Sequence, residues 1–581
     1  MLQTGKKVPL SNLGLDQWLA LIKNAKLLSF DTETTGLKVH SGEDTMLGFS
    51  IALRTDMGVI GEYFPMYHVR GVNLEEEDAF KLLDAIAEKP LAAHNIIFDK
   101  NVLHHAGYSN VERFYCTQRI AHLLDENSKQ YSLDAVSLRF LGYAAKEKDP
   151  DFELALLAYG WAGMPSEIMH KYAKADAVGT FHTLEAQMKN KEFTPQLLNY
   201  WQKIGAPTLS VLAKMRRLGV RIDVDRCIQE QEKGEQIMSE IEERVGGKPS
   251  SSKFLQRVLI EELGLPQIIS KKTGNPTFDK EAMKRYDLML EREKNHNGLA
   301  KEILTYRGWQ KAVSGYYLPY QRFVERDGRL RAEYKPFGTV TGRFSCADPN
   351  LQQIPKETDK AWNGAVKSCL IPADGYKLWE LDYSQLEFRL AAAASREEKL
   401  LEVFNDGHRD IFSEMAAQLE MERQDVKTLT YSIQYGGGVQ RIMDVFGVSK
   451  SRAAEIIGNF YEQYPNLKKA GNAAGRQVAS TGKIGIWSGR ARHFKYPRDE
   501  YYKAFNSYVQ GGAADLVTDV MVKADREIAN EECRLLLQVH DSLVWEIAVG
   551  KEQYYLPEIE KIMTSPQFGV HLAVDSHSWS K

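Results

Sequence analysis

Two acidic side chains follow a run of apolar residues near the start of the chain. The segment LLSFDTETTG, residues 27–36, reads as a buried strand that ends in Asp31 and Glu33. Because side chains alternate along a strand, these two acids point to one face, about 7 Å apart. Two like charges at that spacing are costly unless a cation such as Mg²⁺ neutralises them. The pair predicts a metal site, although D-x-E alone also fits a solvated acidic loop.

Two further pairs carry chemistry at helical spacing. Asn95 and Asp99 in HNIIFDKNV, and Tyr172 and Asp176 in HKYAKADAVGT, are each four residues apart. Residues at that spacing lie on one face of a helix. Either pair alone is common and carries no functional meaning.

All three segments in this order resemble the DEDD exonuclease superfamily, in the variety that contains a tyrosine. The resemblance implies that Asp31, Glu33, Asp99 and Asp176 bind two metal ions and that Tyr172 orients the attacking water. One ion would lower the pKa of that water, and the other would stabilise the leaving oxygen. Since all four acids are present, we expect an active 3′→5′ exonuclease that takes a single-stranded DNA 3′ end.

Another acid lies where a predicted strand meets a predicted helix. Residues 377–381 read as a strand that runs into Asp382. Ser384 and Glu387 have the spacing of a capping box, so we expect a helix to open there. A strand-to-helix junction is a natural place to hold a metal, but capping by itself would account for Glu387.

The segment LLLQVHDSLVWE, residues 535–546, places one more acid between two apolar runs. Gln538, His540 and Asp541 interrupt what otherwise reads as a buried hairpin. Aspartate is favoured wherever a chain reverses, so turn chemistry alone would explain Asp541.

Cations and aromatic residues share a helical stripe in MERQDVKTLTYSIQYGGG. Arg423, Lys427, Tyr431 and Tyr435 recur every four residues. Such a stripe suits a phosphorylated planar ligand, whose phosphates the cations would bind and whose base a ring could stack on. A solvated basic turn followed by core tyrosines is the alternative.

Five segments settle the context, because together and in this order they resemble the family A DNA polymerases, the group of bacterial polymerase I and phage replicative enzymes. They are FGTVTGRFSCADPNLQQIP (337–355), DYSQLEFR (382–389), RQDVKTLTYSIQYG (423–436), NSYVQGGAADL (506–516) and QVHD (538–541). In addition, SSSKFLQRVLIEELGLP (250–266) is similar to the thumb of those enzymes. The resemblance covers the C-terminal two thirds of the chain.

The resemblance implies a role for each matching residue. Asp382 and Asp541 would bind two Mg²⁺ ions, with Mn²⁺ as a substitute, that activate the primer 3′-hydroxyl and neutralise the triphosphate. Arg423 and Lys427 would hold the phosphates of the dNTP, and Lys427 is a candidate to protonate pyrophosphate. Tyr431 would lie beside the sugar and base, Tyr435 near the templating base, and Glu387 would exclude the ribose 2′-hydroxyl. The positions that match contacts to the primer–template DNA are Arg343, Asn350, Asn506, Gln510, Gln538 and His540.

Three positions depart from the family pattern. Ser542 stands where an acid often follows the second palm aspartate, which leaves two palm carboxylates instead of three. Phe412 replaces a histidine that helps to bind phosphate in many relatives. Tyr431 stands where others have phenylalanine, and a tyrosine there relaxes discrimination against a missing 3′-hydroxyl.

These residues require several domains to position them. Strand-like and helical runs alternate over residues 1–190, as in an α/β domain. Residues from about 195 to 330 and from 405 to 480 read as helical, and strand signals return on either side of the second block. We expect one sheet interrupted by a helical insertion. The fold class is therefore multidomain α/β and α+β, with an RNase H-like exonuclease domain before a right-hand polymerase. The expected domains are the exonuclease (1–190), thumb (191–330), first part of the palm (331–400), fingers (401–489) and second part of the palm (490–581).

Composition restricts the class of protein. The chain has 581 residues, of which 43% are hydrophobic and 26% charged, as in folded globular proteins. Its five cysteines form no CxxC pair, which indicates a reduced compartment without a zinc site. A net charge of −3 does not exclude nucleic acid, since the local field governs binding.

Location and partners are expected to be as follows. We expect no membrane span, no secretory signal and a cytoplasmic location in a bacterial cell or phage-infected host, with organellar import left open. We also expect a monomer that works without a 5′-nuclease domain, with or without an accessory processivity factor.

Two other functions stay open at this point. A single-subunit RNA polymerase would share the palm and fingers, but the exonuclease and Glu387 argue against it. A nuclease with a degenerate polymerase module that only grips DNA would not need Asp382, Asp541, Arg423 and Lys427.

Overall fold

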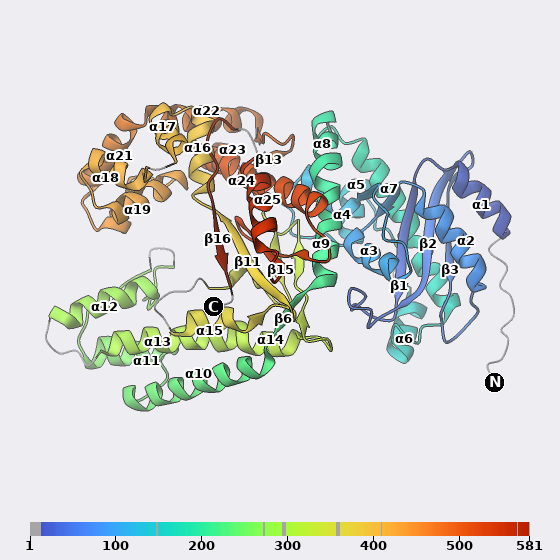
Figure 1. Ribbon diagram of the computed structural model, residues 1–581, viewed down its shortest axis with the longest axis horizontal. Coiled ribbons are helices and arrows are strands. Elements are labelled where there is room, and N and C mark those ends of the chain that lie inside the picture. Colours follow the sequence, from blue (N-terminus) through green and yellow to red (C-terminus); the bar gives the residue numbers. More distant parts are fainter. Residues whose placement is uncertain are drawn as a thin grey trace.

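The computed structural model describes residues 13–146, 149–270, 273–292, 298–355, 361–407, 409–565 and 568–579. Most of the N-terminal segment on which the prediction about a targeting sequence rests, residues 1–12, lies outside them. Figure 1 shows the blue N-terminal part on the right, a central sheet, and two helical arms on the left. Among the described residues, no helix is both long and apolar enough to cross a membrane.

The N-terminal part is an α/β unit. Its five-stranded sheet has the order β3-β2-β1-β4-β5, with β1 antiparallel to β2 and parallel to β4. Strand β1 is buried along almost its whole length. Its elements are α1 (Leu15–Asn24), β1 (Leu28–Thr34), β2 (Met46–Thr55), β3 (Gly58–Pro65), α2 (Glu76–Ala87), β4 (Leu91–Ala93), α3 (Ile96–His105), β5 (Phe114–Cys116), α4 (Thr117–Leu124), α5 (Leu133–Leu141), α6 (Pro150–Tyr159) and α7 (Ser166–Met188).

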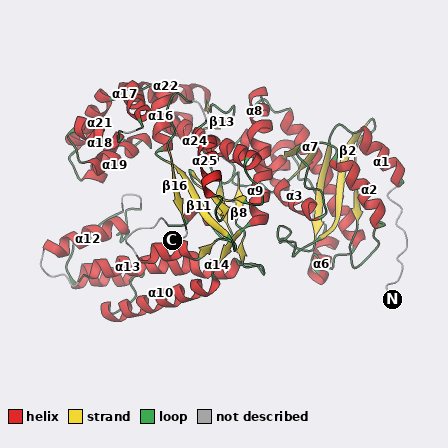
Figure 2. Ribbon diagram, viewed as in Figure 1, coloured by secondary structure: helices red, strands yellow, loops and turns green. Residues whose placement is uncertain are grey.

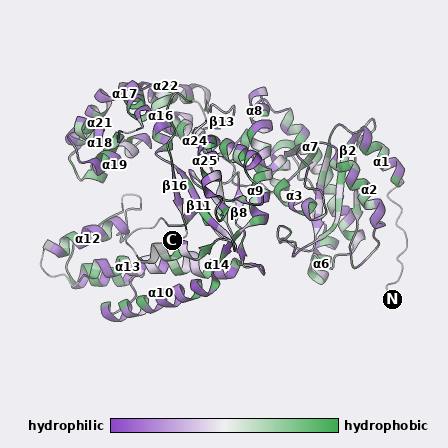
Figure 3. Ribbon diagram, in the orientation of Figure 1, coloured by the Kyte–Doolittle hydropathy of each residue, from purple (hydrophilic) through white to green (hydrophobic). Residues whose placement is uncertain are grey.

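The next part is helical, as expected for 195–330. Figure 3 shows hydrophobic and hydrophilic residues mixed along α10 and α13, which pack on each other. A separate small core joins α11, α12 and α13. The elements are α8 (Pro195–Tyr200), α9 (Ala206–Leu218), β6 (Val220–Ile222), α10 (Val224–Val245), α11 (Ser252–Leu255), α12 (Lys280–Arg292), α13 (Leu299–Ala312) and α14 (Leu318–Phe323).

A sheet at the centre of the molecule is built from distant segments. Its order is β14-β15-β11-β16, and every neighbouring pair is antiparallel. Figure 2 shows these strands between the helical regions. The remaining strands before the insertion are β7 (Arg329–Leu330), β8 (Glu333–Lys335), β9 (Ser345–Ala347), β10 (Leu370–Ile371) and β11 (Tyr376–Tyr383), with α15 (Ala361–Ser368) among them.

The helical insertion follows β11, and the sheet resumes after it. The insertion comprises α16 (Leu386–Ser395), α17 (Glu398–Asp406), α18 (Ile411–Leu419), α19 (Arg423–Gln434), α20 (Val439–Phe446), α21 (Lys450–Gln463) and α22 (Pro465–Thr481). The C-terminal elements are β12 (Lys483–Gly485), β13 (Ala491–His493), α23 (Pro497–Glu500), α24 (Ala504–Glu527), β14 (Cys533–Val539), β15 (Ser542–Ala548), α25 (Glu552–Thr564) and β16 (Val574–Ser578). The prediction of one interrupted sheet is confirmed for β11 and β14–β16. The strands near 483–495 form their own two-stranded sheet instead.

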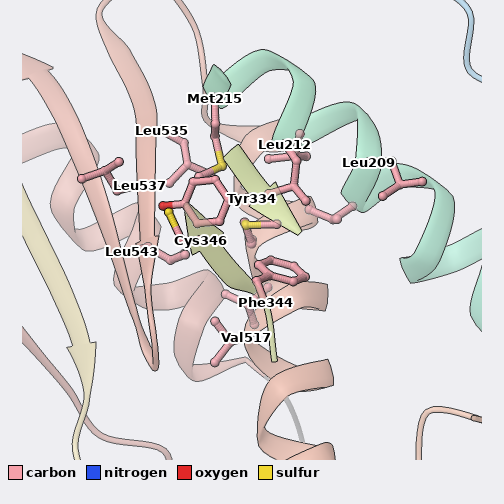
Figure 4. Close-up of a cluster of buried hydrophobic side chains, with 14 of the residues drawn as sticks. Leu209, Leu212, Met215, Tyr334, Phe344, Cys346, Val517, Leu535, Leu537 and Leu543 are labelled. Atoms are coloured by element: carbon pink, nitrogen blue, oxygen red, sulfur yellow. The ribbon is translucent and has the colours of Figure 1, made fainter. Parts of the chain in front are cut away.

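A buried cluster anchors the β14–β15 hairpin. Figure 4 shows Leu535, Leu537 and Leu543 packed toward Tyr334 and toward side chains of α9 and α24. The Tyr334 hydroxyl donates to the carbonyl of Gln538 at 3.1 Å and accepts from its backbone N–H at 3.1 Å. Apolar burial of this extent is the main source of stability in such a core. This buried cluster therefore fixes the position of the β14–β15 turn.

Three local predictions were wrong. The run LAAHNIIF (91–98), one of the strand-like runs expected within residues 1–190, is a strand only to Ala93, and Ile96 already begins α3. Asn95 therefore precedes that helix, in the left-handed region at φ 62°, and does not share a helical face with Asp99. The helix after Asp382 begins at Leu386 behind Gln385 (φ 56°), with no capping hydrogen bond from a side chain. The Ser384 backbone instead joins this turn to Ala573, so a tertiary contact replaces the expected capping box.

Candidate functional sites

Three predicted acids meet at the edge of the N-terminal sheet. Ligand atoms of Asp31 and Glu33 on β1 and of Asp176 on α7 lie within 4.8 Å of one another. Asp99 on α3 lies beside them and accepts hydrogen bonds from the Thr32 backbone N–H at 3.1 Å and its hydroxyl at 2.8 Å. The fold thus brings together four acids from three separate segments.

The electrostatics of this cluster favour a bound cation. Burial and the neighbouring Asp176 raise the pKa of Glu33 to about 8, and burial raises the pKa of Asp99 to about 7. The pKa of Asp31 is raised by burial and by all three neighbouring acids. One oxygen of Asp176, Oδ1, is buried and has no hydrogen-bond partner among the residues that the structure describes. A divalent cation would neutralise the charges and satisfy this oxygen, so the donor set fits the metal that the sequence predicts.

Tyr172 lies one turn before Asp176 on α7. Its ring stacks on Phe152, with 4.1 Å between centroids and 8° between planes. Lys146, which the sequence analysis did not identify, places its Nζ 2.8 Å from Asp176 Oδ2 and 3.6 Å from the Tyr172 ring centroid. Lys146 belongs to an irregular loop with no periodic pattern, so no sequence signal pointed to it.

Asp382 and Asp541 meet at the central sheet. Asp541 and His540 form the two-residue turn between β14 and β15, with His540 at φ 56°. Asp382 is in register with Ser542 on β15, and the Tyr383 backbone N–H donates to the Asp541 carbonyl at 3.3 Å. The hairpin therefore carries Asp541 to the end of β11, as its pattern predicts.

A cavity of about 880 Å³ opens over these two acids. It lies between the sheet, α16 and α19. The predicted site residues that line it are Arg343, Asp382, Glu387, Lys427, Tyr431, Tyr435, His540 and Asp541.

Arg343 joins two of the acids in this cavity. Its Nη2 donates to Glu387 Oε1 at 2.6 Å and to Asp541 Oδ1 at 3.0 Å. Glu387 is buried, and this desolvation raises its pKa although Arg343 opposes the shift. Burial and the nearby Glu387 carboxylate raise the pKa of Tyr435 to about 12. Tyr435 caps α19 at its C-terminal end instead of lying within the helix.

Arg423 lies apart from the cavity, at the opposite end of α19. It makes a bidentate ion pair with Asp410, with distances of 2.7 and 3.1 Å. Phe412 is buried against Phe388 and Tyr431, and both Arg423 and Lys427 lie 5.9 Å from its ring. An aromatic side chain here therefore packs the base of α19 and supports both cations.

The other predicted DNA contacts do not line the cavity. Gln538 is buried and accepts from Gln352 at 2.7 Å, and Asn350 caps a short 3₁₀ turn. Asn506 and Gln510 lie on α24, where Asn506 lines a different cavity, between α19, α22 and α24. The Oδ1 atom of Asn506 is buried and has no hydrogen-bond partner in the described part of the chain, so it has capacity for a ligand.

Two acids in the main cavity were missed. Glu380 precedes Asp382 by two residues on β11, and Asp575 on β16 is in register with Asp382. The Ser542 hydroxyl donates to Glu380 Oε1 at 3.0 Å, and Lys367 and Trp579 bind Glu380 Oε2 at 3.0 and 2.7 Å. The alternation rule applied to Asp31 and Glu33 would have placed Glu380 on the face of Asp382. A carboxylate thus stands beside Ser542 after all, but it comes from the neighbouring strand.

Comparison with known proteins decides the family. The family model for "DNA polymerase family A" matches residues 226–580, which is more than half of the chain. The chain belongs to DNA polymerase family A. A second model, for a 3′-5′ exonuclease, matches residues 9–191.

Individual relatives agree with this family. DNA polymerase I of Pseudomonas aeruginosa is 28% identical over 575 residues, covering 93% of this chain and 61% of the relative. The thermostable DNA polymerase I of Thermus aquaticus is 32% identical over 391 residues, covering 63% of this chain and 45% of the relative. The chain thus spans about 60% or less of the length of these relatives. A solved structure, the polymerase domain of Pol1 from M. smegmatis in complex with DNA primer-template and dNTP, has a TM-score of 0.82 at 22% identity. It covers 97% of this chain and 98% of that one, and shows that the two share a fold.

Proposed function

We propose that the chain is a template-directed DNA polymerase that also removes nucleotides from a DNA 3′ end. The observation that carries the proposal is the meeting of Asp382 and Asp541 in one cavity with Lys427, Tyr431 and Glu387. Family membership and the likeness to a polymerase domain solved with primer-template and dNTP support it.

In the polymerase cavity, the acids would hold divalent ions and the surrounding residues would hold the dNTP. Two ions at Asp382 and Asp541 would lower the pKa of the primer 3′-hydroxyl and stabilise the charge of the triphosphate. Lys427 would bind the phosphates, and Tyr431 and Glu387 would contact the sugar. Arg343, which already joins Glu387 to Asp541, would align both acids.

The remaining cation, Arg423, would bind phosphates after it leaves Asp410. Its exposed ion pair is weak enough to exchange, since water and salt screen such surface pairs. Gln538 and Asn350 would act indirectly, by holding the hairpin and the neighbouring turn. Asn506 and Gln510 would contact DNA along α24.

In the second site, Asp31, Glu33, Asp99 and Asp176 would bind the ions that activate water. Tyr172 would orient that water. Binding of the frayed 3′ end would rely on stacking and backbone charge, so it would not depend on base identity. The proposed regions are the exonuclease (1–190), thumb (191–330), palm (331–400 and 490–581) and fingers (401–489).

Primer extension tests both activities. With Mg²⁺ and dNTPs the primer should lengthen, and without dNTPs it should shorten from the 3′ end. Asp541→Ala should abolish lengthening and spare shortening, whereas Asp31→Ala with Glu33→Ala should do the reverse.

The competing functions make different predictions in the same assay. Extension with NTPs but not dNTPs would indicate an RNA polymerase. Shortening without any extension would indicate a nuclease that only grips DNA, and unchanged lengthening by the Asp541→Ala variant would refute the assignment of the polymerase site.

A further inference from the structure

Lys146 places a positive charge inside the exonuclease cluster. It lies in the loop between α5 and α6, and its side chain is 23% exposed. Its Nζ is 2.8 Å from Asp176 Oδ2, which is hydrogen-bond distance for a charged pair. Asp176 is one of the three acids whose ligand atoms converge within 4.8 Å. The ammonium group therefore occupies one oxygen of Asp176, Oδ2, and leaves the other, Oδ1, to a cation bound by this cluster.

The same ammonium group clamps Tyr172. Its Nζ is 3.6 Å from the Tyr172 ring centroid, and the Phe152 ring stacks on Tyr172 with centroids 4.1 Å apart. A parallel ring that close leaves no space for Nζ on the same face, so Lys146 and Phe152 cover opposite faces. A cation over an aromatic face is attracted to it, which adds to the ion pair with Asp176.

A divalent ion and this ammonium group compete for Asp176. Mg²⁺ binds carboxylate oxygens at about 2.0–2.1 Å and demands near-octahedral geometry. An ion bound to Asp176 at that distance would be only a few ångströms from Nζ, and two positive charges so close repel strongly in a partly buried site. The ammonium group must therefore leave Oδ2 before both oxygens of Asp176 can bind the metal, and its charge also opposes an ion at Oδ1.

We propose that Lys146 is a counter-ion of the acidic cluster that a bound divalent cation displaces from Asp176. It neutralises part of the acidic cluster and holds Tyr172 against Phe152. Metal entry replaces it at Asp176 and releases one face of Tyr172, so metal binding and the positioning of Tyr172 are coupled. Lys146 is a positioning residue by this argument, and the proposal rests on the exonuclease function proposed above.

Metal titration tests the proposal. The full chain would carry Asp382→Asn and Asp541→Asn to silence the polymerase site, and Mn²⁺ binding would be measured by calorimetry. Lys146→Met should bind Mn²⁺ at least about tenfold more tightly, since a charge removed from a few ångströms away changes a binding constant by that factor or more. Lys146→Arg keeps the charge and should restore affinity to within a few-fold. Lys81→Met, at an exposed lysine paired with Glu77 and Asp78, is the matched control and should have no effect.

Thermal unfolding gives a second readout that does not depend on activity. In EDTA, Lys146→Met should lower the melting temperature because the acids lose their counter-ion, and Mn²⁺ should abolish this difference. Unchanged or weaker Mn²⁺ binding by Lys146→Met would overturn the proposal. If the Asp31→Asn, Glu33→Gln double variant then loses Mn²⁺ binding, the exonuclease assignment still holds and only the role of Lys146 is refuted. If the parent chain itself binds no Mn²⁺, the proposed exonuclease function is refuted.

Discussion

At the scale of single residues, the proposed polymerase cavity combines acids that would bind ions with side chains that would recognise a sugar. Glu387 is buried and held by Arg343, while Tyr431 is half-buried on the facing helix α19. Both line the cavity above Asp382 and Asp541. Their chemistry therefore makes separate predictions about the 2′ and 3′ positions of the nucleotide.

Tyr431→Phe should reduce incorporation of dideoxynucleotides relative to deoxynucleotides. In the proposed role, the tyrosine hydroxyl would supply a hydrogen-bonding group near the sugar, and losing one hydrogen bond corresponds to roughly 2- to 10-fold. Competition between ddNTP and dNTP in a chain-termination assay measures the ratio. Strong rejection of ddNTPs by the unmodified chain would contradict this role of Tyr431.

Glu387→Ala should relax selection against ribonucleotides. Removing the side chain opens space for a 2′-hydroxyl, so the ratio of kcat/KM for dNTP over NTP should fall at least about tenfold, as when a pocket stops excluding a group. Single-nucleotide insertion kinetics measure it. Glu402→Ala, at an exposed acid on α17, should leave the ratio unchanged, and an equal ratio in both variants would refute the steric role.

At the scale of elements, the register of β11 and β15 explains why position 542 holds a serine and not an acid. This hydroxyl donates to Glu380, so the position already faces a carboxylate that Lys367 and Trp579 hold. An acid at 542 would place two carboxylates side by side, which is costly in a buried site.

Ser542→Glu should therefore destabilise the chain by about 1–3 kcal/mol, the usual cost of an unpaired buried charge or polar group. Adding Glu380→Ser should recover most of that loss, because one carboxylate then remains. Chemical denaturation of both single variants and the double variant measures the coupling. Additive effects would show that the two positions act independently.

At the scale of the whole molecule, ion pairs join the segments that follow α4 and α7 to strands β12 and β13. Glu126, next to α4, accepts from Arg492 at 2.7 Å and contacts His493 at 3.0 Å. Glu192 contacts both His493 and Lys483. These contacts connect segments separated by about 300 residues or more. The relative position of the two proposed sites therefore depends on them.

The docking of the N-terminal α/β unit against strands β12 and β13 should weaken at high pH. Burial opposes the charged form of His493, but hydrogen bonds and charges from Glu126 and Glu192 raise its pKa above 6.5. A raised folded pKa contributes stability that is complete below the unfolded pKa and is lost as pH rises through the folded pKa. Limited proteolysis between the two parts should therefore accelerate above neutral pH.

Glu126→Gln should remove this pH dependence and destabilise docking. Breaking a buried pair while its partners remain costs about 3–5 kcal/mol. Glu325→Gln, at a separate buried contact with His40, is the control. This variant should keep the dependence of the proteolysis rate on pH that arises from His493. If the proteolysis rate of the Glu126→Gln variant depends on pH in the same way as that of the unmodified chain, His493 is not the origin of this dependence.

The amino-acid pattern by itself determined what depends on neighbours along the chain. Alternation placed Asp31 beside Glu33, an apolar run with a polar turn predicted the hairpin that carries Asp541, and helical spacing predicted α7 and α19. Motif order indicated the family. Local rules failed at Asn95 and at Ser384, where a left-handed residue and a contact with Ala573 set the start of the helix.

Only the tertiary structure decided which side chains from distant segments meet. The contacts of Lys146 with Asp176, of Ser542 with Glu380 and of Arg343 with Asp541 join residues 30, 162 and 198 positions apart. None belongs to a periodic pattern, because packing of whole elements against one another brings them together. For the same reason, the sequence could propose Arg423 as a phosphate ligand, but only the fold showed that Asp410 holds it.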